Sequence, residues 1–376
     1  MVSRERVLNA FDKKGYDRIP VKHEGTPEIN KLIMDHFGLS CYEQVLKVTG
    51  DDFRYIEAVY NGPALRRYPD GSFEGWFGSH FKWTDFGEGR YLESASLPYK
   101  EVKTIEELDR SRFPKAEYFD FSTLKSQCEA LSGEYAIVFG SAGDLSFING
   151  IGRYRGQDQV LMDIIDENPV YMELVKERYK FYFELHKNAL QAADGLIDIV
   201  HVGEDLGDQL GPMISPALFD KLLAPLYKEY FTMAHSYGAR TMMHMCGCVD
   251  KFLPRLIEIG LDVYDVVQPT TPEMDIAVLQ KNYGENLTFC GSVCAQTTLP
   301  YHSVQDVEKE VRRRLDLFPK GGLFLGPSHA IQVGTPLENI LALYKTAGSL
   351  AETIDDSILN IKASEKKEIN LFKLFG

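Results

Sequence analysis

Short apolar segments alternate with longer amphipathic segments from about residue 135 onward. The apolar segments predict β-strands, and the amphipathic segments at 175–190, 218–237 and 304–317 predict helices between them. Because a parallel crossover needs a dozen or more residues, this alternation favours a parallel sheet with covering helices. The strands are predicted at 136–139, 197–202, 241–245, 263–267, 287–290 and 323–325.

The N-terminal third of the chain has a different pattern. It begins with helix, an extended stretch at 18–21 before and after Pro20, and more helix. Turn motifs between short aromatic segments predict a β-hairpin insertion at 67–99, too short to bury its own core. No linker interrupts the later series, so we expect an α/β fold, a (β/α)8 TIM barrel with N-terminal helical and β-hairpin elaborations. Residues 1–360 are predicted to form this single domain, followed by a C-terminal tail at 361–376.

Composition and net charge restrict the classes of partner that we expect and indicate the cellular compartment. The 376 residues include 41 lysines and arginines and 55 aspartates and glutamates, a formal net charge of −14. Such a surface repels phosphate backbones and anionic lipids, which argues against nucleic acid or a membrane as a partner. The sequence contains neither a membrane-spanning apolar run nor a secretory signal at its start. Four of the six cysteines lie between 246 and 294, unlike a disulfide scaffold, so we expect a cytoplasmic protein.

Metal-binding residue types occur at the end of the predicted strand at 241–245. His244 and Cys246 are two residues apart and share a face of a strand, so both can reach one zinc ion. A third ligand must come from another strand end, and His329 and Cys294 both follow apolar strands on the same rim. Three protein ligands with an open fourth position are typical of catalytic zinc. Packing of a histidine and two thiols without a metal is the structural alternative.

Other polar residues at predicted strand ends and loops are candidates for catalysis and substrate binding. Glu204 and Asp205 are adjacent carboxylates on a glycine-flanked stretch, which suits general acid or base catalysis, although a solvated acidic loop explains them too. Arg153 and Tyr154 are candidates to hold substrate carboxylates, and Gln268 is a candidate to hydrogen-bond substrate; surface charge and loop packing are the alternatives. The absence of phosphate-loop and dinucleotide fingerprints argues against a kinase or a nicotinamide-dependent dehydrogenase.

Several motifs together resemble the uroporphyrinogen decarboxylase superfamily and span most of the chain. The resemblance implies a (β/α)8 barrel, and Asp52 is similar to the pyrrole-binding aspartate of the decarboxylases. The arginine-rich N-terminal loop of true decarboxylases is missing, and the equivalent stretch at 22–28 is acidic. The matching motifs are 4–8, 17–21, 203–207 with 215–216, 244–247, and 321–332 with 335–339.

The chain is more similar to the zinc-dependent methyltransferases of this superfamily. Their zinc motif is H-x-C on one strand and a cysteine on the last, matched by His244 and Cys246, with His329 in place of the cysteine. The resemblance implies methyl transfer from methylcobalamin-type corrinoid on a partner protein to a small-molecule acceptor, assisted by Zn²⁺. Glu204 and Asp205 would orient the acceptor or take its proton. Metal-independent decarboxylation of uroporphyrinogen or a related acidic substrate is the alternative, and the resemblance also favours a homodimer.

Overall fold

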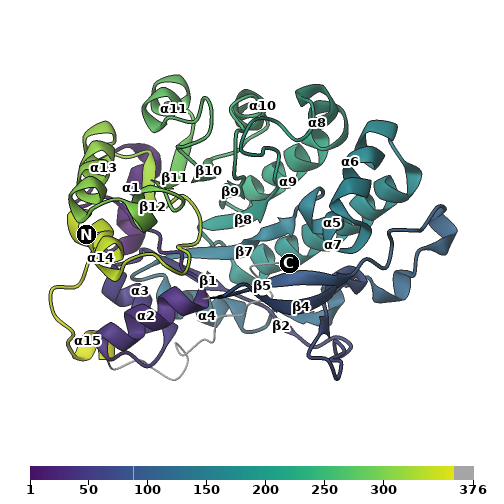
Figure 1. Cartoon of the computed structure of the whole chain (residues 1–376), viewed down its shortest axis with the longest axis horizontal. Coiled ribbons are helices and arrows are strands. Elements are labelled where there is room, and N and C mark those ends of the chain that lie inside the picture. The colour runs from purple at the N-terminus through teal and green to yellow at the C-terminus, as the bar shows by residue number, and fades with distance from the viewer. Residues whose placement is uncertain (88, 360–376) are drawn as a thin grey trace.

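A curled sheet of seven parallel strands forms the centre of the computed structural model, which describes residues 1–87 and 89–359 (Figure 1). The strand order is β1-β7-β8-β9-β10-β11-β12, with helices between consecutive strands. The predicted α/β barrel is confirmed, and all six strands predicted after residue 135 are present. The bounds are β1 (Phe53–Ile56), β7 (Ala136–Leu145), β8 (Ile199–Gly203), β9 (Arg240–His244), β10 (Val263–Val267), β11 (Thr288–Val293) and β12 (Leu323–Pro327).

The segment 20–25 fills the eighth position of the barrel. Val21 forms a parallel bridge with Leu325 of β12. On its other side, the N–H of Asp52, just before β1, donates to the carbonyl oxygen of Val21 at 2.9 Å. The extended stretch predicted at 18–21 therefore leads into the segment that closes the barrel.

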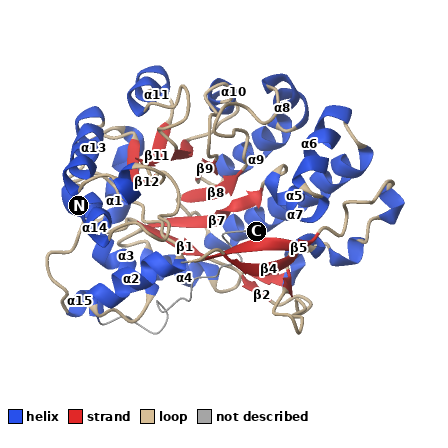
Figure 2. Cartoon of the chain, viewed as in Figure 1, coloured by secondary structure: helices blue, strands red, loops and turns tan. Residues whose placement is uncertain are grey.

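Helices cover the outside of the sheet, as Figure 2 shows. The helix predicted at 175–190 is longer, because Asn168 caps it and Pro169 occupies its first turn. The stretch predicted at 218–237 is two helices, because Pro225 cannot continue the preceding helix. The bounds are α1 (Ser3–Asp12), α2 (Pro27–Phe37), α3 (Tyr42–Thr49), α4 (Leu124–Leu131), α5 (Asn149–Arg155), α6 (Gln157–Asp166), α7 (Pro169–Ala193), α8 (Pro216–Leu222), α9 (Ala224–Ser236), α10 (Leu253–Glu258), α11 (Ile276–Tyr283), α12 (Thr298–Tyr301), α13 (Val304–Leu317), α14 (Leu337–Thr346) and α15 (Asp356–Leu359).

The insertion expected at 67–99 is a β-hairpin with one short additional strand. Its buried cluster contains only Phe73, Phe81 and Leu92, which agrees with an element too small to fold alone. The expected tail at 361–376 lies outside the described residues. No described helix has the length and apolar character needed to cross a membrane. The remaining strands are β3 (Phe73–Glu74), β4 (His80–Asp85) and β5 (Arg90–Ser96) in the insertion, and β2 (Val59–Tyr60) paired with β6 (Phe119–Asp120).

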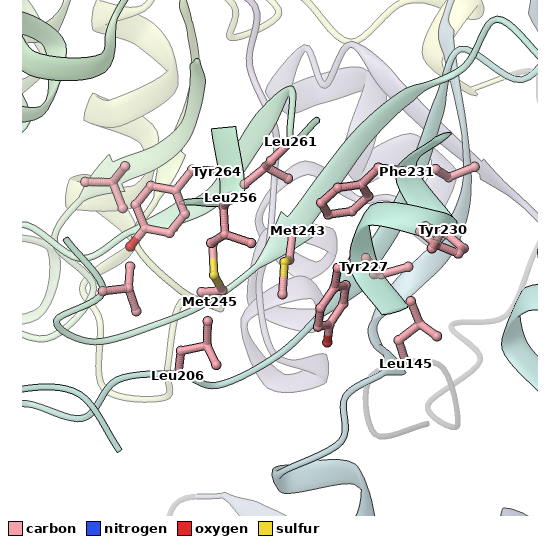
Figure 3. Close-up of a cluster of buried hydrophobic side chains, with 14 of the residues drawn as sticks. Leu145, Leu206, Tyr227, Tyr230, Phe231, Met243, Met245, Leu256, Leu261 and Tyr264 are labelled. Carbon is pink, nitrogen blue, oxygen red and sulfur yellow. The ribbon is translucent and has the colours of Figure 1, made fainter. Parts of the chain in front are cut away.

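Alternate residues of β9 face opposite sides of the sheet. Met243 points outward and belongs to the same buried cluster as Phe231 of α9 (Figure 3). Met242 belongs instead to the cluster inside the barrel. Because side chains alternate along a strand, His244, the last residue of β9, shares the inward direction of Met242.

An apolar layer closes the barrel interior at the amino ends of the strands. Helix α1 contributes Val7 and Ala10 to this layer, and the strands contribute the rest. Polar inward-facing residues above the layer are therefore approached from the carboxyl ends of the strands, which we call the mouth. The layer contains Val7, Ala10, Phe53, Ala136, Val138, Ile199, Met242, Val263, Cys290 and Phe324.

Candidate active site

A layer of polar side chains lies directly above the apolar layer. Tyr55, His201 and Asp265 each follow an inward apolar residue by two positions, so they face the same interior. His244 joins them from β9, and Lys22 joins them from the segment that closes the barrel. Buried groups of this kind need partners, and here they partner one another.

Asp265 is the centre of this layer and is fully buried. Its Oδ1 lies 3.0 Å from Nζ of Lys22, which also lies 3.2 Å from Oε2 of Glu24. Its Oδ2 lies 3.0 Å from Nδ1 of His244 and 3.4 Å from Nε2 of His201. One carboxylate therefore fixes three basic side chains that come from three different strand positions.

The charges in this layer stabilise one another. Burial by itself raises the pKa of Asp265, but Lys22 and the two histidines hold that pKa well below its usual range. Burial lowers the pKa of Lys22, and the acidic groups around it, Asp265 foremost, more than reverse this effect. For His244 too, burial lowers the pKa and the hydrogen bond to Asp265 raises it above its usual value. Opposite charges and hydrogen bonds thus outweigh the cost of desolvation.

A candidate set of metal ligands lies on the side of His244 that faces the mouth. Since Asp265 accepts only, Nδ1 of His244 donates to it, and Nε2 remains for a ligand. Asp205, His244 and Cys246 have ligand atoms that all lie within 4.8 Å of one another. Sγ of Cys246 is 3.5 Å from Oδ1 of Asp205. His201, His244 and Asp265 form a second such group, with all three residues buried.

His329 lies beside His244. The two ring centroids are 5.8 Å apart, and the ring planes meet at 72°. Among the described residues, however, the closely spaced groups of metal-binding atoms contain neither His329 nor Cys294. The third residue grouped with His244 and Cys246 is Asp205, which was not predicted as a metal ligand.

Cys294, the alternative ligand, has its own set of hydrogen bonds. Its Sγ accepts from Oγ1 of Thr297 at 3.2 Å and from the N–H of Gln296 at 3.4 Å. Burial raises the pKa of Cys294, but these hydrogen bonds outweigh burial and lower it below its usual value. They hold the sulfur against the turn that follows β11.

Glu204 and Asp205 are adjacent but have different surroundings. Glu204 is 1% exposed and accepts from the N–H groups of Phe147 at 2.6 Å and Ile148 at 3.0 Å. Burial raises the pKa of Glu204 to about 8. These contacts favour a positioning role over the catalysis that the sequence led us to expect. Asp205 accepts hydrogen bonds from Asn149 and Cys246. Because it is also partly exposed, a ligand at the mouth can reach its carboxylate.

The three predicted substrate-binding residues after residue 150 lie in different environments. Tyr154 is 1% exposed and stacks on Phe77 with centroids 5.7 Å apart, so it belongs to the core. Arg153 is partly buried on α5, with Cζ 5.9 Å from the ring centroid of Phe81 in the insertion. Gln268 lies at the mouth, directly after β10. Its Oε1 accepts from the N–H of Gly247, in the loop that carries Cys246.

Asp52 lies at the opposite end of the barrel from the mouth. It is fully buried just before β1 and accepts from Arg6 Nη1 at 2.6 Å and Arg18 Nη1 at 2.8 Å. It also accepts from the N–H of Val21 at 2.7 Å. Two guanidinium groups and a backbone amide at the amino ends of the strands favour a structural role over the substrate contact that the resemblance implied.

Five residues in or beside the polar layer were not predicted from the sequence as site residues: Lys22, Glu24, Tyr55, His201 and Asp265. The sequence did contain a signal for two of them, namely a polar residue inside an apolar strand segment. Such a residue is costly to bury without a partner, so it indicates a polar site. The aspartate within Val-Tyr-Asp-Val-Val and the histidine within Ile-Val-His-Val are such cases. Both turn out to be inward-facing members of the polar layer.

These features define a (β/α)8-barrel protein with a polar site at the carboxyl ends of its strands, where barrel enzymes have their active sites. The model of the family described as uroporphyrinogen decarboxylase (URO-D) matches residues 153–350, more than half of the chain. The chain therefore belongs to the uroporphyrinogen decarboxylase family, which confirms the superfamily inferred from the motifs. No curated protein sequence matches significantly.

A solved structure supports the same architecture. A methyltransferase from Methanosarcina mazei is similar with a TM-score of 0.62 and 17% sequence identity, over 93% of this chain and 98% of that one. A B12-independent methionine synthase from a Shewanella species has a TM-score of 0.38 and 11% identity, over 61% of this chain and 64% of that one. At such low identity, the likeness to the Methanosarcina protein shows a shared fold.

Proposed function

We propose that this protein transfers a methyl group from a corrinoid carried by a partner protein to a small acceptor, with the help of zinc. The observation that carries the proposal is the close grouping of His244, Cys246 and Asp205, with His244 oriented by Asp265. A carboxylate that fixes the tautomer of a histidine is the usual second partner of a zinc-binding imidazole. Family membership and the name of the similar Methanosarcina protein support methyl transfer as the reaction.

The donor set fits zinc in residue type and in number. His244 and Cys246 would hold the ion with His329 as third ligand, and Asp205 and Cys294 are the alternatives for the third position. Imidazole and thiolate are preferred zinc ligands, and three protein ligands leave a position open. Bound zinc would supply a Lewis acid that lowers the pKa of an acceptor such as a thiol.

The surrounding residues would orient the reactants and control protons. Asp265 keeps the proton on Nδ1 of His244, and Lys22 neutralises the charge that this carboxylate adds to the interior. Asp205 is the carboxylate available to accept a proton from the acceptor, and Asn149 fixes its orientation. The apolar layer below excludes water from the base of the site.

The direct test is metal content together with methyl transfer. Protein purified without chelator is expected to contain about one zinc per chain, and H244A is expected to contain far less. With methylcobalamin and a simple alkanethiol, the wild type should demethylate the corrinoid, which is visible in its absorption spectrum. The exposed His36 provides a control, since H36A should match the wild type. Wild-type protein that neither binds zinc nor demethylates methylcobalamin would contradict the proposal.

Decarboxylation without a metal is the second candidate, because the matching family model is that of the uroporphyrinogen decarboxylases. Incubation with uroporphyrinogen under anaerobic conditions tests it. Porphyrins with fewer carboxyl groups, formed equally by wild type and by H244A, would favour this function over zinc-dependent methyl transfer.

A further inference from the structure

Three glutamine side chains meet at the mouth of the barrel. Gln268 follows β10 and is 5% exposed, whereas Gln209 and Gln296 come from the loops after β8 and β11 and are exposed. Nε2 of Gln268 lies 3.0 Å from Oε1 of Gln209 and 3.0 Å from Oε1 of Gln296. Oε1 of Gln268 accepts from the N–H of Gly247 at 3.0 Å, next to Cys246.

A backbone amide fixes the orientation of all three side chains. The N–H of Gly247 can only donate, so the atom of Gln268 that it contacts must be the oxygen. The other end of Gln268 is then the NH₂ group, and its two partners must be the oxygens of Gln209 and Gln296. The NH₂ groups of Gln209 and Gln296 have no hydrogen-bond partner within residues 1–87 and 89–359.

The loop that carries Gln209 contains its own hydrogen bonds. Gly207 and Pro212 form an antiparallel bridge, and Oδ1 of Asp208 accepts from the N–H groups of Leu210 at 2.7 Å and Gly211 at 2.8 Å. Leu210, at the tip of this turn, is 85% exposed. An exposed apolar side chain therefore lies next to Gln209 in the chain.

We propose that Gln209 and Gln296 bind the carbonyl oxygens of carboxamide groups on a ligand, namely the amide side chains around a corrin ring. This inference rests on the proposed function for the identity of the ligand. The two NH₂ groups together offer four N–H donors, which can bind carbonyl oxygens. Leu210 offers apolar contact to the edge of the ring. We call Gln209, Gln268 and Gln296 the amide cluster.

The local charge selects neutral amides over carboxylates. Asp208 directly precedes Gln209, Asp205 contacts Cys246 beside Gly247, and the chain carries a formal net charge of −14. A ligand rich in carboxylates would meet repulsion there, whereas a ring bearing neutral amides would not.

The test is equilibrium binding of cyanocobalamin to the full-length protein by calorimetry. Q209E and Q296E keep the oxygen that accepts from Gln268 but lose the NH₂ donors, so each should raise Kd about tenfold. The neutral variants Q209M and Q296M separate the lost donors from the added charge and should also weaken binding. Q305E carries the same charge change on the exposed side of α13 and should leave Kd unchanged. Dicyanocobyrinic acid, with carboxylates in place of the amides, should bind the wild type at least about tenfold more weakly.

Two results would overturn this inference: no binding of cyanocobalamin by the wild type, or equal affinity in the wild type and all four variants at positions 209 and 296. Its failure is separable from that of the proposed function. Zinc content and demethylation of methylcobalamin that persist beside unchanged Kd values would refute the role of the amide cluster alone. Loss of binding in the variants, in a protein without zinc or methyl transfer, would refute the proposed reaction and retain the amide cluster.

Discussion

Asp265 and His244 are register partners on the neighbouring parallel strands β10 and β9, and Oδ2 of Asp265 lies 3.0 Å from Nδ1 of His244. Both side chains face the barrel interior, and the carboxylate is fully buried. The pairing is therefore a consequence of sheet register, and it turns the remaining ring nitrogen of His244 into the available ligand atom. Asp265 acts on the site through His244 and is a positioning residue.

Replacing Asp265 tests this orientation directly. D265N retains the shape of the side chain but removes the charge that fixes the histidine tautomer. Loss of such an outer partner typically weakens metal affinity by about 10–100-fold, and we expect a decrease in this range. Competition with a zinc chelator measures it. The exposed Asp220 on α8 gives the matched control D220N, which should bind zinc as the wild type does; equal affinity in D265N and D220N would contradict the assignment.

Lys22 should be coupled to Asp265 in stability. K22M leaves the buried carboxylate without its ammonium partner 3.0 Å away, which typically costs about 3–5 kcal/mol of unfolding free energy. The double variant K22M/D265N removes both charges and should be more stable than K22M alone. Urea denaturation of the wild type, the two single variants and the double variant measures the coupling. Additive effects of the two substitutions would show that the ion pair does not stabilise the fold.

The arrangement of the site could be predicted from the sequence only where it depends on local periodicity. The period of two predicts that His244, at the end of β9, and Cys246, two residues beyond it, lie on one side, because this is a local property of the chain. The pairing of His244 with Asp265 depends on the register between two strands, which no local pattern encodes. The same limit applies to Lys22, which reaches Asp265 from 243 positions away in the chain.

The surroundings of adjacent residues at a strand end are also difficult to predict from the sequence. Glu204 and Asp205 look equivalent in the sequence, yet one carboxylate is buried among backbone N–H groups and the other is partly exposed at the mouth. Their directions depend on the turn after β8, whose course follows from contacts with the loop at 147–149. A long sequence separation again prevents prediction.

Glu204 can be assigned to positioning or to proton transfer by comparing two variants. E204A leaves the N–H groups of Phe147 and Ile148 without an acceptor, which should reduce the unfolding free energy by about 3 kcal/mol. E204Q keeps one acceptor oxygen and should lose less stability while retaining most of the methyl-transfer rate. Urea denaturation and turnover measure the two effects, with the exposed E184Q on α7 as control. A rate at least about 100-fold lower in a stable E204Q would instead favour proton transfer.

His23 should make the stability of the barrel depend on pH. The ring is buried, with Nε2 2.8 Å from Oδ1 of Asn30 and Nδ1 2.6 Å from Oη of Tyr344. Burial lowers the pKa of His23 to about 4. The unfolded chain, with a histidine pKa of about 6.5, binds a proton more readily between these two values. The contribution of His23 is therefore complete above about pH 6.5 and is lost as the pH falls toward 4.

The size and origin of this pH dependence can be measured with two glutamine variants. Between pH 7 and pH 5 the unfolding free energy of the wild type should fall by about 2 kcal/mol more than that of H23Q, which cannot take up the proton. H36Q, altered at an exposed histidine on α2, should follow the wild type. Urea denaturation at several pH values gives the slopes. Parallel curves for the wild type and H23Q would mean that the buried ring is protonated as easily in the folded protein as in the unfolded chain.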